Sequence, residues 1–448
     1  MDTIPLAQAG RYSGDPLTLA FAEKTSAVAG LRPQPVAPAE SASLWARLAA
    51  EPPGAGKRLV YVHIPFCKTQ CSYCGFYQNT TRAQHVAAYV ARLLLELERA
   101  RGLAACEAPF HAIYVGGGTP TDLTEAQIIQ LGEAFHRYLP MCGDCEITFE
   151  SRFSGLSDVK IQAVFDAGFN RVSLGVQTFD TTLRRRMSRI DDQAYLLDRL
   201  QRLAEADRAA IVIDLLYGLP WQTLEDWQRD LSTLLALPLD GADLYQLLLL
   251  PHTRMGKAVA AGGMPSPADT ALKAQMFRAG VELLQQNHVS RLSVSHWGCT
   301  TRERNIYNHY AKAGTHMVPF GCGAGGRVQG HGVMLHRALP AYLAAVDAGQ
   351  KPVVAMTRPH PAYRVHGVIA EGFDSGYLNL HDIQRRSGID LAADAGPLLA
   401  AWERNGLVSR HAGFVTLTLA GQFWQVNLQQ GLLDYLEEKT HHESDGGH

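Results

Sequence analysis

The chain has 448 residues, of which 46% are hydrophobic and 19% are charged, and its formal net charge is -2 at pH 7. This composition is ordinary for a globular protein with a large core, and the length allows up to three domains. The near-neutral charge excludes the strongly basic surface that binds nucleic acid or acidic membranes nonspecifically.

The N-terminal stretch MDTIPLAQAGRYSGDPLTLAFAEK lacks a basic segment followed by an apolar one, and no window approaches the ~18 consecutive apolar residues of a transmembrane helix. We therefore expect a cytoplasmic protein with no membrane or nucleic-acid partner. Eight cysteines are too few for a disulfide scaffold, and three of them lie in one short loop. In a reducing compartment this pattern favours metal or redox chemistry.

Strand-like and helix-like segments alternate from about Arg58 onward. Short β-branched or aromatic runs predict strands at 58–64, 111–117, 145–150, 171–177, 209–220 and 243–251. Helical spacing of apolar residues predicts helices at 84–100, 124–139, 157–168, 193–207 and 224–237. Six strands with intervening helices favour the α/β class, with a parallel sheet in a partial (β/α)6 barrel.

Three further regions flank the predicted barrel domain at 56–265. An N-terminal extension, 1–55, ends in the linker-like AAEPPGAGK, and a Gly, His and Tyr-rich region, 266–354, follows the barrel as a substrate region. The segment 355–448 reads helix, helix, hairpin, helix, which predicts a winged-helix-like domain. This last segment has 7 Lys plus Arg against 11 Asp plus Glu, so we expect it to pack and not to bind DNA.

Unusual residues follow the ends of successive predicted strands. A cysteine loop follows the first strand, GGGTPTD the second, and Glu150, Gln177 and DLLYGLP close the next three. Because chemistry in β/α barrels lies at the carboxyl ends of the strands, these residues are expected to converge on one rim.

The cysteine loop, FCKTQCSYCGFYQN, places Cys67, Cys71 and Cys74 at the spacing C-x-x-x-C-x-x-C. Iron-sulfur cubes are usually held by four thiolates, so three thiolates leave one iron with an open position for a substrate or cofactor. Structural zinc takes four closed ligands, commonly with C-x-x-C pairs, and fits this loop poorly.

This motif after a first barrel strand resembles the signature of the radical S-adenosylmethionine (SAM) enzymes. In that family the open iron of a 4Fe–4S cluster chelates SAM, and one-electron reduction cleaves it to methionine and a 5′-deoxyadenosyl radical. The resemblance implies that the three cysteines ligate the cluster. From about Val60 to Pro251 the chain is similar to the branch that contains oxygen-independent coproporphyrinogen III oxidase and related heme chaperones.

The resemblance also implies the residues that bind SAM. Tyr61, in YVHIPFC, contacts the first SAM and belongs to the catalytic set, and the backbone of the glycine motif can approach its methionine amino group. The implied cofactor contacts are Tyr61, Gly116, Gly117, Gly118 and Glu150 for the first SAM and Gln177, Arg189 and Asp214 for a second SAM. Tyr73 and Thr119 complete the cofactor-binding set.

The continuation of the cysteine loop separates three readings within the branch. The oxidase continues C-G-C and the chaperones usually continue C-D-F, whereas this chain has C-G-F at 74–76. The CGFY continuation, the N-terminal extension and the segments LSVSHWGCTTRERNIYNHY and FGCGAGGRVQGHG are similar to the anaerobic heme-degrading radical SAM methyltransferases. Heme chaperone and coproporphyrinogen oxidase remain the alternative functions.

Membership of that family implies a heme substrate, two SAM molecules and release of iron from a methylated linear tetrapyrrole. A methylene radical from the second SAM would attack a meso carbon of heme. A flavodoxin or ferredoxin is the expected electron donor, because cluster potentials extend to about -700 mV, and a heme-delivery protein is a further expected partner.

Heme must be held with its edge toward the radical, and the region after the barrel offers candidates for this contact. His296 beside Trp297 is the first choice, as an iron ligand or proton donor next to an aromatic face. The other candidates are Tyr307, His309 and His331. Cys142 and Cys145 form a C-x-x-C, which we interpret as incidental loop cysteines and not as a second cluster site.

Overall fold

The computed structural model describes residues 4–24, 29–30 and 34–445. The chain forms two compact units. The larger unit comprises residues 33–267 and 296–359, and the smaller unit combines residues 1–32, 268–295 and 360–448.

The larger unit is built on one sheet with the strand order β1-β15-β14-β13-β12-β2-β5-β6-β7-β8-β9-β11. Its central strands run parallel. They are β12 (His316–Phe320), β2 (Arg58–Ile64), β5 (Phe110–Gly117), β6 (Met141–Ser151), β7 (Arg171–Gln177), β8 (Ala210–Tyr217) and β9 (Gly241–Gln246). The α/β class and the six predicted parallel strands are thus confirmed, and the pairing among the described residues is that of an open sheet.

Antiparallel strands extend this sheet at both edges. Next to β12 the chain adds β13 (Gly325–Val328), β14 (His331–Leu335), β15 (Val353–Arg358) and β1 (Gln34–Pro35). At the other edge β11 (His296–Gly298) pairs with β9. Two short strands, β3 (Phe66–Cys67) and β4 (Asn79–Thr80), pair with each other in the cysteine loop.

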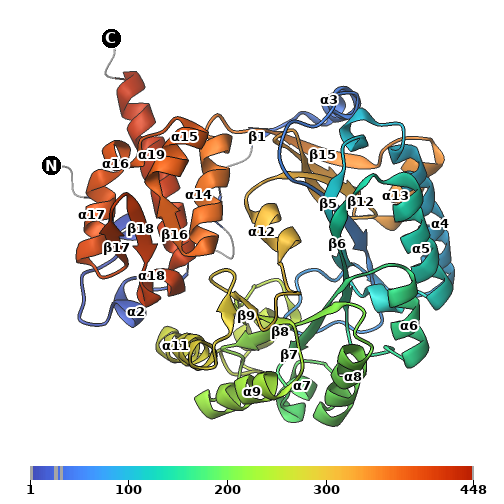
Figure 1. Cartoon of the computed structure of the whole chain (residues 1–448), viewed down its shortest axis with the longest axis horizontal. Helices are drawn as coiled ribbons and strands as arrows, with labels where there is room; N and C mark the ends of the chain where they lie inside the picture. Colours follow the sequence, from blue (N-terminus) through green and yellow to red (C-terminus); the bar gives the residue numbers. More distant parts are fainter. Residues whose placement is uncertain (1–3, 25–28, 31–33, 446–448) are drawn as a thin grey trace. The chain divides into compact units, whose positions relative to one another are not determined.

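Helices that connect the parallel strands lie on the outer side of the sheet (Figure 1). They are α4 (Ala83–Ala100), α5 (Glu125–Tyr138), α6 (Asp158–Asp166), α7 (Thr181–Arg186), α8 (Gln193–Glu205) and α9 (Leu224–Ala236). Two of them begin with capping boxes, at Thr124 and Thr223, whose side chains satisfy free backbone N–H groups. In contrast, α12 (Ile306–Lys312) lies on the inner side, against β5 and β2.

The smaller unit contains the winged-helix-like module that the sequence predicts. Its antiparallel sheet has the order β16-β18-β17. In chain order the elements are α14 (Tyr363–Ser375), β16 (Tyr377–Asn379), α15 (Leu380–Ser387), α16 (Leu391–Asp394), α17 (Gly396–Arg404), β17 (Val408–His411), β18 (Phe414–Leu417), α18 (Leu419–Phe423) and α19 (Gln425–Asp445). The strand β16 was not predicted.

The two units differ from the predicted domain boundaries. The extension does not form one element: α1 (Leu6–Ala9) packs against α17 and α19, whereas α3 (Pro38–Ala49) packs against β15 of the larger unit. The predicted flanking region also divides, because α11 (Thr270–Gln286) packs against α2 (Pro16–Leu19) and α18. In that contact the rings of Phe277 and Phe423 lie 5.5 Å apart. Burial of apolar faces far apart in the sequence therefore sets the boundaries.

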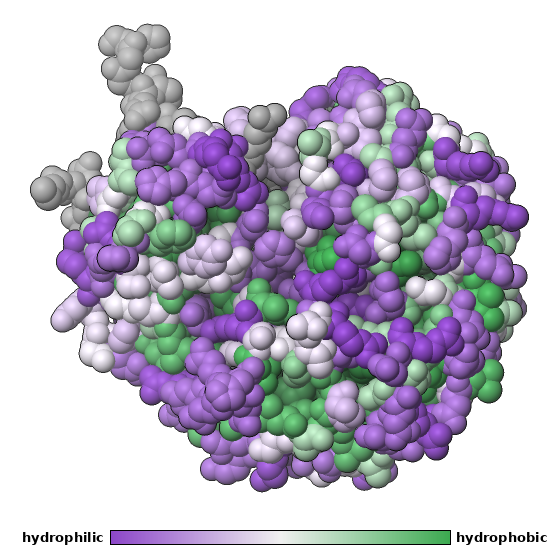
Figure 2. Space-filling model, in the orientation of Figure 1, coloured by the Kyte–Doolittle hydropathy of each residue, from purple (hydrophilic) through white to green (hydrophobic). Residues whose placement is uncertain are grey.

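The surface is mixed in polarity. On the face drawn in Figure 2, hydrophilic residues cover most of the area and hydrophobic residues form scattered patches. Within the described part of the chain, no helix has the length and apolar character needed to cross a membrane.

Candidate active site

The carboxyl ends of five parallel strands form one rim that carries most of the predicted site residues. The neighbours β2, β5, β6, β7 and β8 end side by side. Backbone hydrogen bonds from Gly118 to Ile64 (2.8 Å) and from Thr119 to Phe66 (2.7 Å) join the glycine motif to the cysteine loop. The Gly117 N–H donates to Glu150 Oε2 at 3.1 Å, which joins β5 to β6. The convergence of these motifs is confirmed.

The three cysteines of the loop each accept a hydrogen bond at sulfur. Thr119 Oγ1 donates to Cys67 Sγ, Arg152 Nη2 to Cys71 Sγ and the Phe76 N–H to Cys74 Sγ, each at 3.3 Å. Cys67 and Cys71 are buried, Cys74 is half-buried, and none forms a disulfide. Donors aimed at sulfur stabilise thiolates, so the loop is arranged to hold soft metal ligands.

Charges around the loop favour the thiolate at one position. Burial alone would raise the pKa of Cys71, but the cations Arg189 and Arg152 outweigh burial and lower it. Burial raises the pKa of Cys67 to about 11. Among the described residues, no three His, Cys, Asp or Glu side chains converge on a single metal ion. A 4Fe–4S cluster does not need such convergence, because each thiolate binds a different iron, and this donor set fits it.

Glycine is required at two positions of the glycine motif, where its backbone passes close to β2 and the cysteine loop. A Cβ atom at Gly118 would lie 2.4 Å from the Phe66 carbonyl oxygen and 2.6 Å from that of Ile64. At Gly117, where φ is +103°, a Cβ would lie 2.3 Å from the His63 ring. These backbone segments approach so closely that only glycine fits.

Replacement of Gly118 with Ala is expected to destabilise the protein by about 1–3 kcal/mol, because the obstructing atoms belong to the backbone and cannot rotate away. Cluster retention should fall with stability, since the same carbonyls hold the cysteine loop. Thermal unfolding and iron content of the purified variant test this expectation. Gly54→Ala is the matched control, because its Cβ would meet nothing within 4 Å. A Gly118→Ala protein that melts with the wild type would contradict the expected crowding.

Tyr61, on β2, is held from two directions. Its hydroxyl lies 2.9 Å from His63 Nδ1, and the Gln78 amide lies 3.1 Å from the other ring nitrogen of His63. Burial lowers the pKa of His63 to about 4, so this ring is neutral at pH 7. The Tyr61 ring also lies 6.4 Å from the rings of both Tyr114 and Tyr307. The structure thus fixes Tyr61 at the inner face of the sheet.

The predicted second-SAM residues lie near the ends of β7 and β8. Gln177 has φ +72°, a left-handed conformation that is uncommon for residues other than glycine. Arg189 donates to the Gly175 carbonyl at 2.7 Å and to the Tyr73 hydroxyl at 3.1 Å. Gly175 is the register partner of Asp214, so these side chains belong to one neighbourhood.

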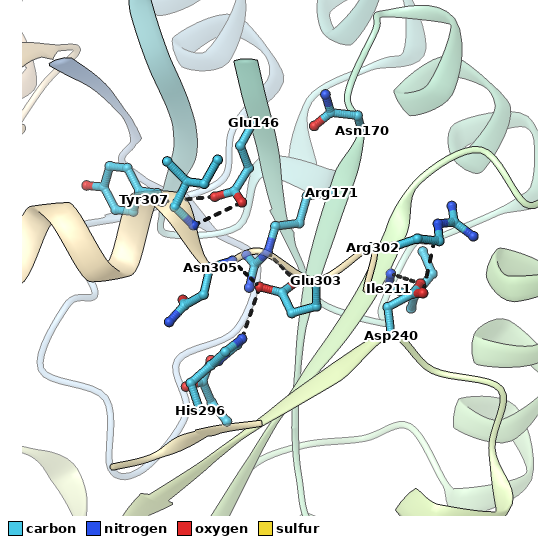
Figure 3. Close-up of polar contacts among 12 residues, drawn as sticks. Glu146, Asn170, Arg171, Ile211, Asp240, His296, Arg302, Glu303, Asn305 and Tyr307 are labelled. Carbon is cyan, nitrogen blue, oxygen red and sulfur yellow. Dashed lines mark hydrogen bonds and ion pairs between the residues drawn. The ribbon is translucent and has the colours of Figure 1, made fainter. Parts of the chain in front are cut away.

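A buried network of charges lies deeper, below the rim (Figure 3). His296 lies 2.7 Å from Asp243 Oδ2 through Nδ1 and 3.0 Å from Glu303 Oε1 through Nε2. Glu303 also pairs with Arg171 at 2.9 Å. The Arg171 and His296 charges outweigh burial and lower the pKa of Glu303 to about 2, and the two carboxylates raise that of His296 to about 9.

The same network positions Tyr307. Glu303 accepts the Asn305 N–H at 2.7 Å, and Glu146 accepts the N–H groups of Ile306 and Tyr307 at 3.1 and 3.0 Å (Figure 3). These bonds fix the start of α12, from which the Tyr307 ring stacks on Tyr114 at 4.5 Å. Tyr307 therefore faces the inner side of the sheet.

The first choice for a heme ligand is not supported by the structure. His296 is fully buried and both ring nitrogens face carboxylates, so neither nitrogen is available to an iron in this arrangement. Trp297 cannot stack beside it, because successive residues of β11 point to opposite faces. His309 lies on α12, and His331 lies on β14 with Nδ1 3.2 Å from the Gln329 carbonyl. The five predicted heme residues thus lie on three separate elements.

Four charged residues of this network were not predicted: Glu146, Arg171, Asp243 and Glu303. Arg171 begins the buried strand RVSLGVQ and Asp243 lies within GADLYQ, and a charged residue in such a strand is the signal that could have marked them. Glu303 lies in a loop and carries no comparable signal.

A pocket of about 310 Å³ lies at the opposite, amino-terminal end of the strands. Its lining includes Arg208 and Arg302, which pair with Asp166 at 2.9 Å and Asp207 at 2.6 Å. Because this pocket lies away from the cysteine loop, we assign no part of the reaction to it.

Known proteins resemble this chain in both sequence and fold. A family model described as the radical SAM superfamily matches residues 61–234. The chain is 37% identical over 408 residues to the anaerobilin synthase of Escherichia coli O157:H7, with 90% of each chain covered. It is also 33% identical over 243 residues to the heme chaperone HemW of Lactococcus lactis. That match covers 53% of this chain and 61% of HemW.

Matches to coproporphyrinogen oxidases are more distant in sequence. The oxygen-independent coproporphyrinogen III oxidase of Pseudomonas aeruginosa is 26% identical over 388 residues, with 81% of this chain and 82% of that protein covered. The solved structure of coproporphyrinogen III oxidase (HemN) from Escherichia coli has the same fold, with a TM-score of 0.76 at 22% identity over 96% of this chain and 100% of that one.

The cysteine loop, the parallel sheet and these matches define the class: this chain is a radical SAM enzyme. Within that class it belongs to the family that includes the anaerobilin synthase of Escherichia coli. The class implies a 4Fe–4S cluster and SAM as cofactors, and Cys67, Cys71 and Cys74 are the thiolates that fit the cluster.

Proposed function

We propose that this chain opens the heme ring without oxygen, transfers a SAM-derived methyl unit to the tetrapyrrole and releases iron. The observation that carries this proposal is the 37% identity to anaerobilin synthase, which extends over 90% of both chains. The match to HemW stops at about half of this chain. Similarity that extends well beyond the cofactor domain favours a shared reaction over a shared cofactor domain alone.

The rim residues have separate roles in this proposal. Cys67, Cys71 and Cys74 would hold the cluster, which when bound and reduced would supply the electron for reductive cleavage of SAM. Tyr61, Glu150 and the backbone of residues 116–118 position the first SAM, and Tyr73 and Thr119 complete the SAM-binding set. We further propose that Gln177, Arg189 and Asp214 bind a second SAM, the source of the methyl unit.

The substrate is proposed to lie on the inner side of the sheet. The stacked rings of Tyr114 and Tyr307 offer a flat aromatic surface there, 4.5 Å apart and next to Tyr61. Planar ligands are held by such surfaces through stacking. His309 and His331 remain proposed heme contacts, whereas the fixed bonds of His296 assign it to the protein's own charge network.

The proposed reaction needs electrons at low potential. A flavodoxin or ferredoxin is the proposed donor, and a heme-delivery protein is the proposed source of substrate. All eight cysteines are free thiols, which agrees with the cytoplasmic setting that we propose.

A heme chaperone is the second candidate function. The match to HemW supports it, because that protein is 33% identical to this chain over 243 residues. A chaperone and a heme-degrading enzyme share the cluster and the fold, so heme affinity does not separate them. Turnover does.

The test is an anaerobic incubation of cluster-reconstituted protein with heme, SAM and a strong reductant. We expect loss of the Soret band, together with 5′-deoxyadenosine, S-adenosylhomocysteine and a methylated linear tetrapyrrole identified by mass spectrometry. Omission of SAM is the control for chemical bleaching of heme. An intact Soret band with heme still bound would overturn the proposal and favour the chaperone.

A further inference from the structure

Three ionisable side chains form a row across neighbouring strands. Asp214 on β8 is the register partner of Asp243 on β9, and Asp243 is the register partner of His296 on β11. Register partners on paired strands project to the same face of a sheet. The three side chains therefore lie side by side on the inner face, with Asp214 at the end nearest to Gly175, Gln177 and Arg189.

The charges of two members of this row are fixed by their partners. His296 contacts Asp243 through one nitrogen (2.7 Å) and Glu303 through the other (3.0 Å), so the imidazolium satisfies both carboxylates. Glu303 is itself paired with Arg171. Each of these side chains is at most 3% exposed. Arg171, Glu303, His296 and Asp243 thus alternate basic and acidic side chains, so the cation beside Asp243 is shared with Glu303.

Within the described part of the chain, no cation pairs with Asp214 as His296 pairs with Asp243. Burial raises its pKa well above the ordinary value, and the neighbouring carboxylates of Asp243 and Glu150 raise it further. Arg171 and His296 oppose this effect but already serve Glu303 and Asp243. The ionisable groups that surround Asp214 are Glu150 on β6, Arg171 on β7, Asp243 and Tyr245 on β9, His296 on β11, Tyr114 on β5 and, beyond Gly175, Arg189.

We propose that Asp214 carries a proton in the ligand-free protein and releases it to solvent when the sulfonium cation of SAM binds beside it. The Asp214 O–H bond breaks, the proton passes to buffer, and the resulting carboxylate faces the sulfonium. No electron moves in this step. Binding of a cation next to buried acids favours their ionised form, so ligand affinity and proton release are linked.

Because of this linkage, the site distinguishes ligands by their charge. S-adenosylhomocysteine differs from SAM by the methyl group and the sulfonium charge, and it cannot drive ionisation of Asp214. The protein should therefore bind SAM more tightly than S-adenosylhomocysteine, and this preference should be largest at high pH, where release of the Asp214 proton to solvent is easiest. The inference rests on the radical SAM class and on contact of SAM with Asp214; it does not require that heme is the substrate.

The experiment is anaerobic titration calorimetry of the cluster-reconstituted protein without reductant, with SAM and separately with S-adenosylhomocysteine. Each ligand is measured in two buffers of different ionisation enthalpy, which gives the number of protons released. The titrations are made at about pH 6, where the amino groups of both free ligands are protonated, so a proton lost from that group on binding iron is common to both and cancels in the difference. We expect about one more proton released with SAM, and a preference for SAM that rises about tenfold per pH unit while Asp214 is protonated.

Two isosteric variants assign the proton. Asp214→Asn should abolish the difference between the two ligands and its pH dependence. Asp243→Asn removes the neighbouring carboxyl group that raises the pKa of Asp214, so it should move the pH dependence to lower pH. The exposed carboxylate of Asp166, which pairs with Arg208, supplies the control variant Asp166→Asn, which should match the wild type.

Equal proton release with both ligands in the wild-type protein would overturn the inference, and so would an unchanged difference in Asp214→Asn. The wild-type comparison stands even if a variant does not fold. Failure of heme turnover, by contrast, would overturn the proposed function and leave this result intact, so the two proposals fail separately.

Discussion

The Cys71→Ala variant is expected to lose the iron-sulfur cluster and all SAM-dependent activity together. Cys71 is buried, accepts a hydrogen bond from Arg152 and has a thiol pKa lowered by two arginines, so no neighbouring group can replace its thiolate. Formation of 5′-deoxyadenosine should fall by at least about a thousandfold, a loss of about 4 kcal/mol of transition-state stabilisation. Iron content, the cluster's visible absorbance and deoxyadenosine yield measure the three effects.

The control for this experiment is Cys142→Ala. Cys142 lies at the start of β6, at the end of the strand opposite to the rim, and was interpreted as an incidental cysteine. This variant should keep the wild-type iron content and activity. Full activity of Cys71→Ala would contradict the cluster assignment, and loss of iron in Cys142→Ala would indicate a second cluster site.

Much of the larger unit could be predicted because its signals are local. The strands 58–64 and 171–177 have the bounds that the sequence predicts, since each is a short apolar run between turn signals. The rim was predictable for the same reason: motifs at the carboxyl ends of parallel neighbours must meet.

The predictions that the structure does not support depend on contacts between distant parts of the chain, which local sequence patterns do not reveal. His296 and Trp297 are adjacent in sequence, yet a strand sends them to opposite faces, so adjacency did not mean contact. The bonds that occupy the His296 ring come from Asp243 and from Glu303, a loop residue. The smaller unit was divided wrongly, because helices from three distant segments share its apolar core.

The buried network also has the largest expected effect on stability, which the variant Arg171→Met would reveal. Arg171 is 3% exposed and Glu303 is fully buried, so the substitution leaves a carboxylate without one of its cations. Removal of one partner of a buried pair costs about 3–5 kcal/mol, and here the low end is expected because His296 still contacts Glu303. Denaturant unfolding of cluster-free protein at pH 7 measures the loss.

The pH dependence separates this electrostatic effect from a packing defect. The pKa of Glu303 is lowered to about 2, so its ion pair stabilises the folded protein above the unfolded-state pKa of about 4.3. That stabilisation is lost as pH falls toward 2. The difference in unfolding free energy between the wild type and Arg171→Met should therefore shrink as the pH falls below about 4. A cavity, by contrast, would lower the stability equally at pH 7 and at low pH.

The matched control is Arg208→Met, which makes the same substitution at the edge of the nearby pocket. Arg208 pairs with Asp166, but both side chains are more than 40% exposed, so solvent screens the pair and the stability should change little. If the two variants unfold alike, the buried network does not contribute as argued. A large, pH-dependent loss confined to Arg171→Met would show that the charges below the rim hold the inner face, and with it Tyr307, in place.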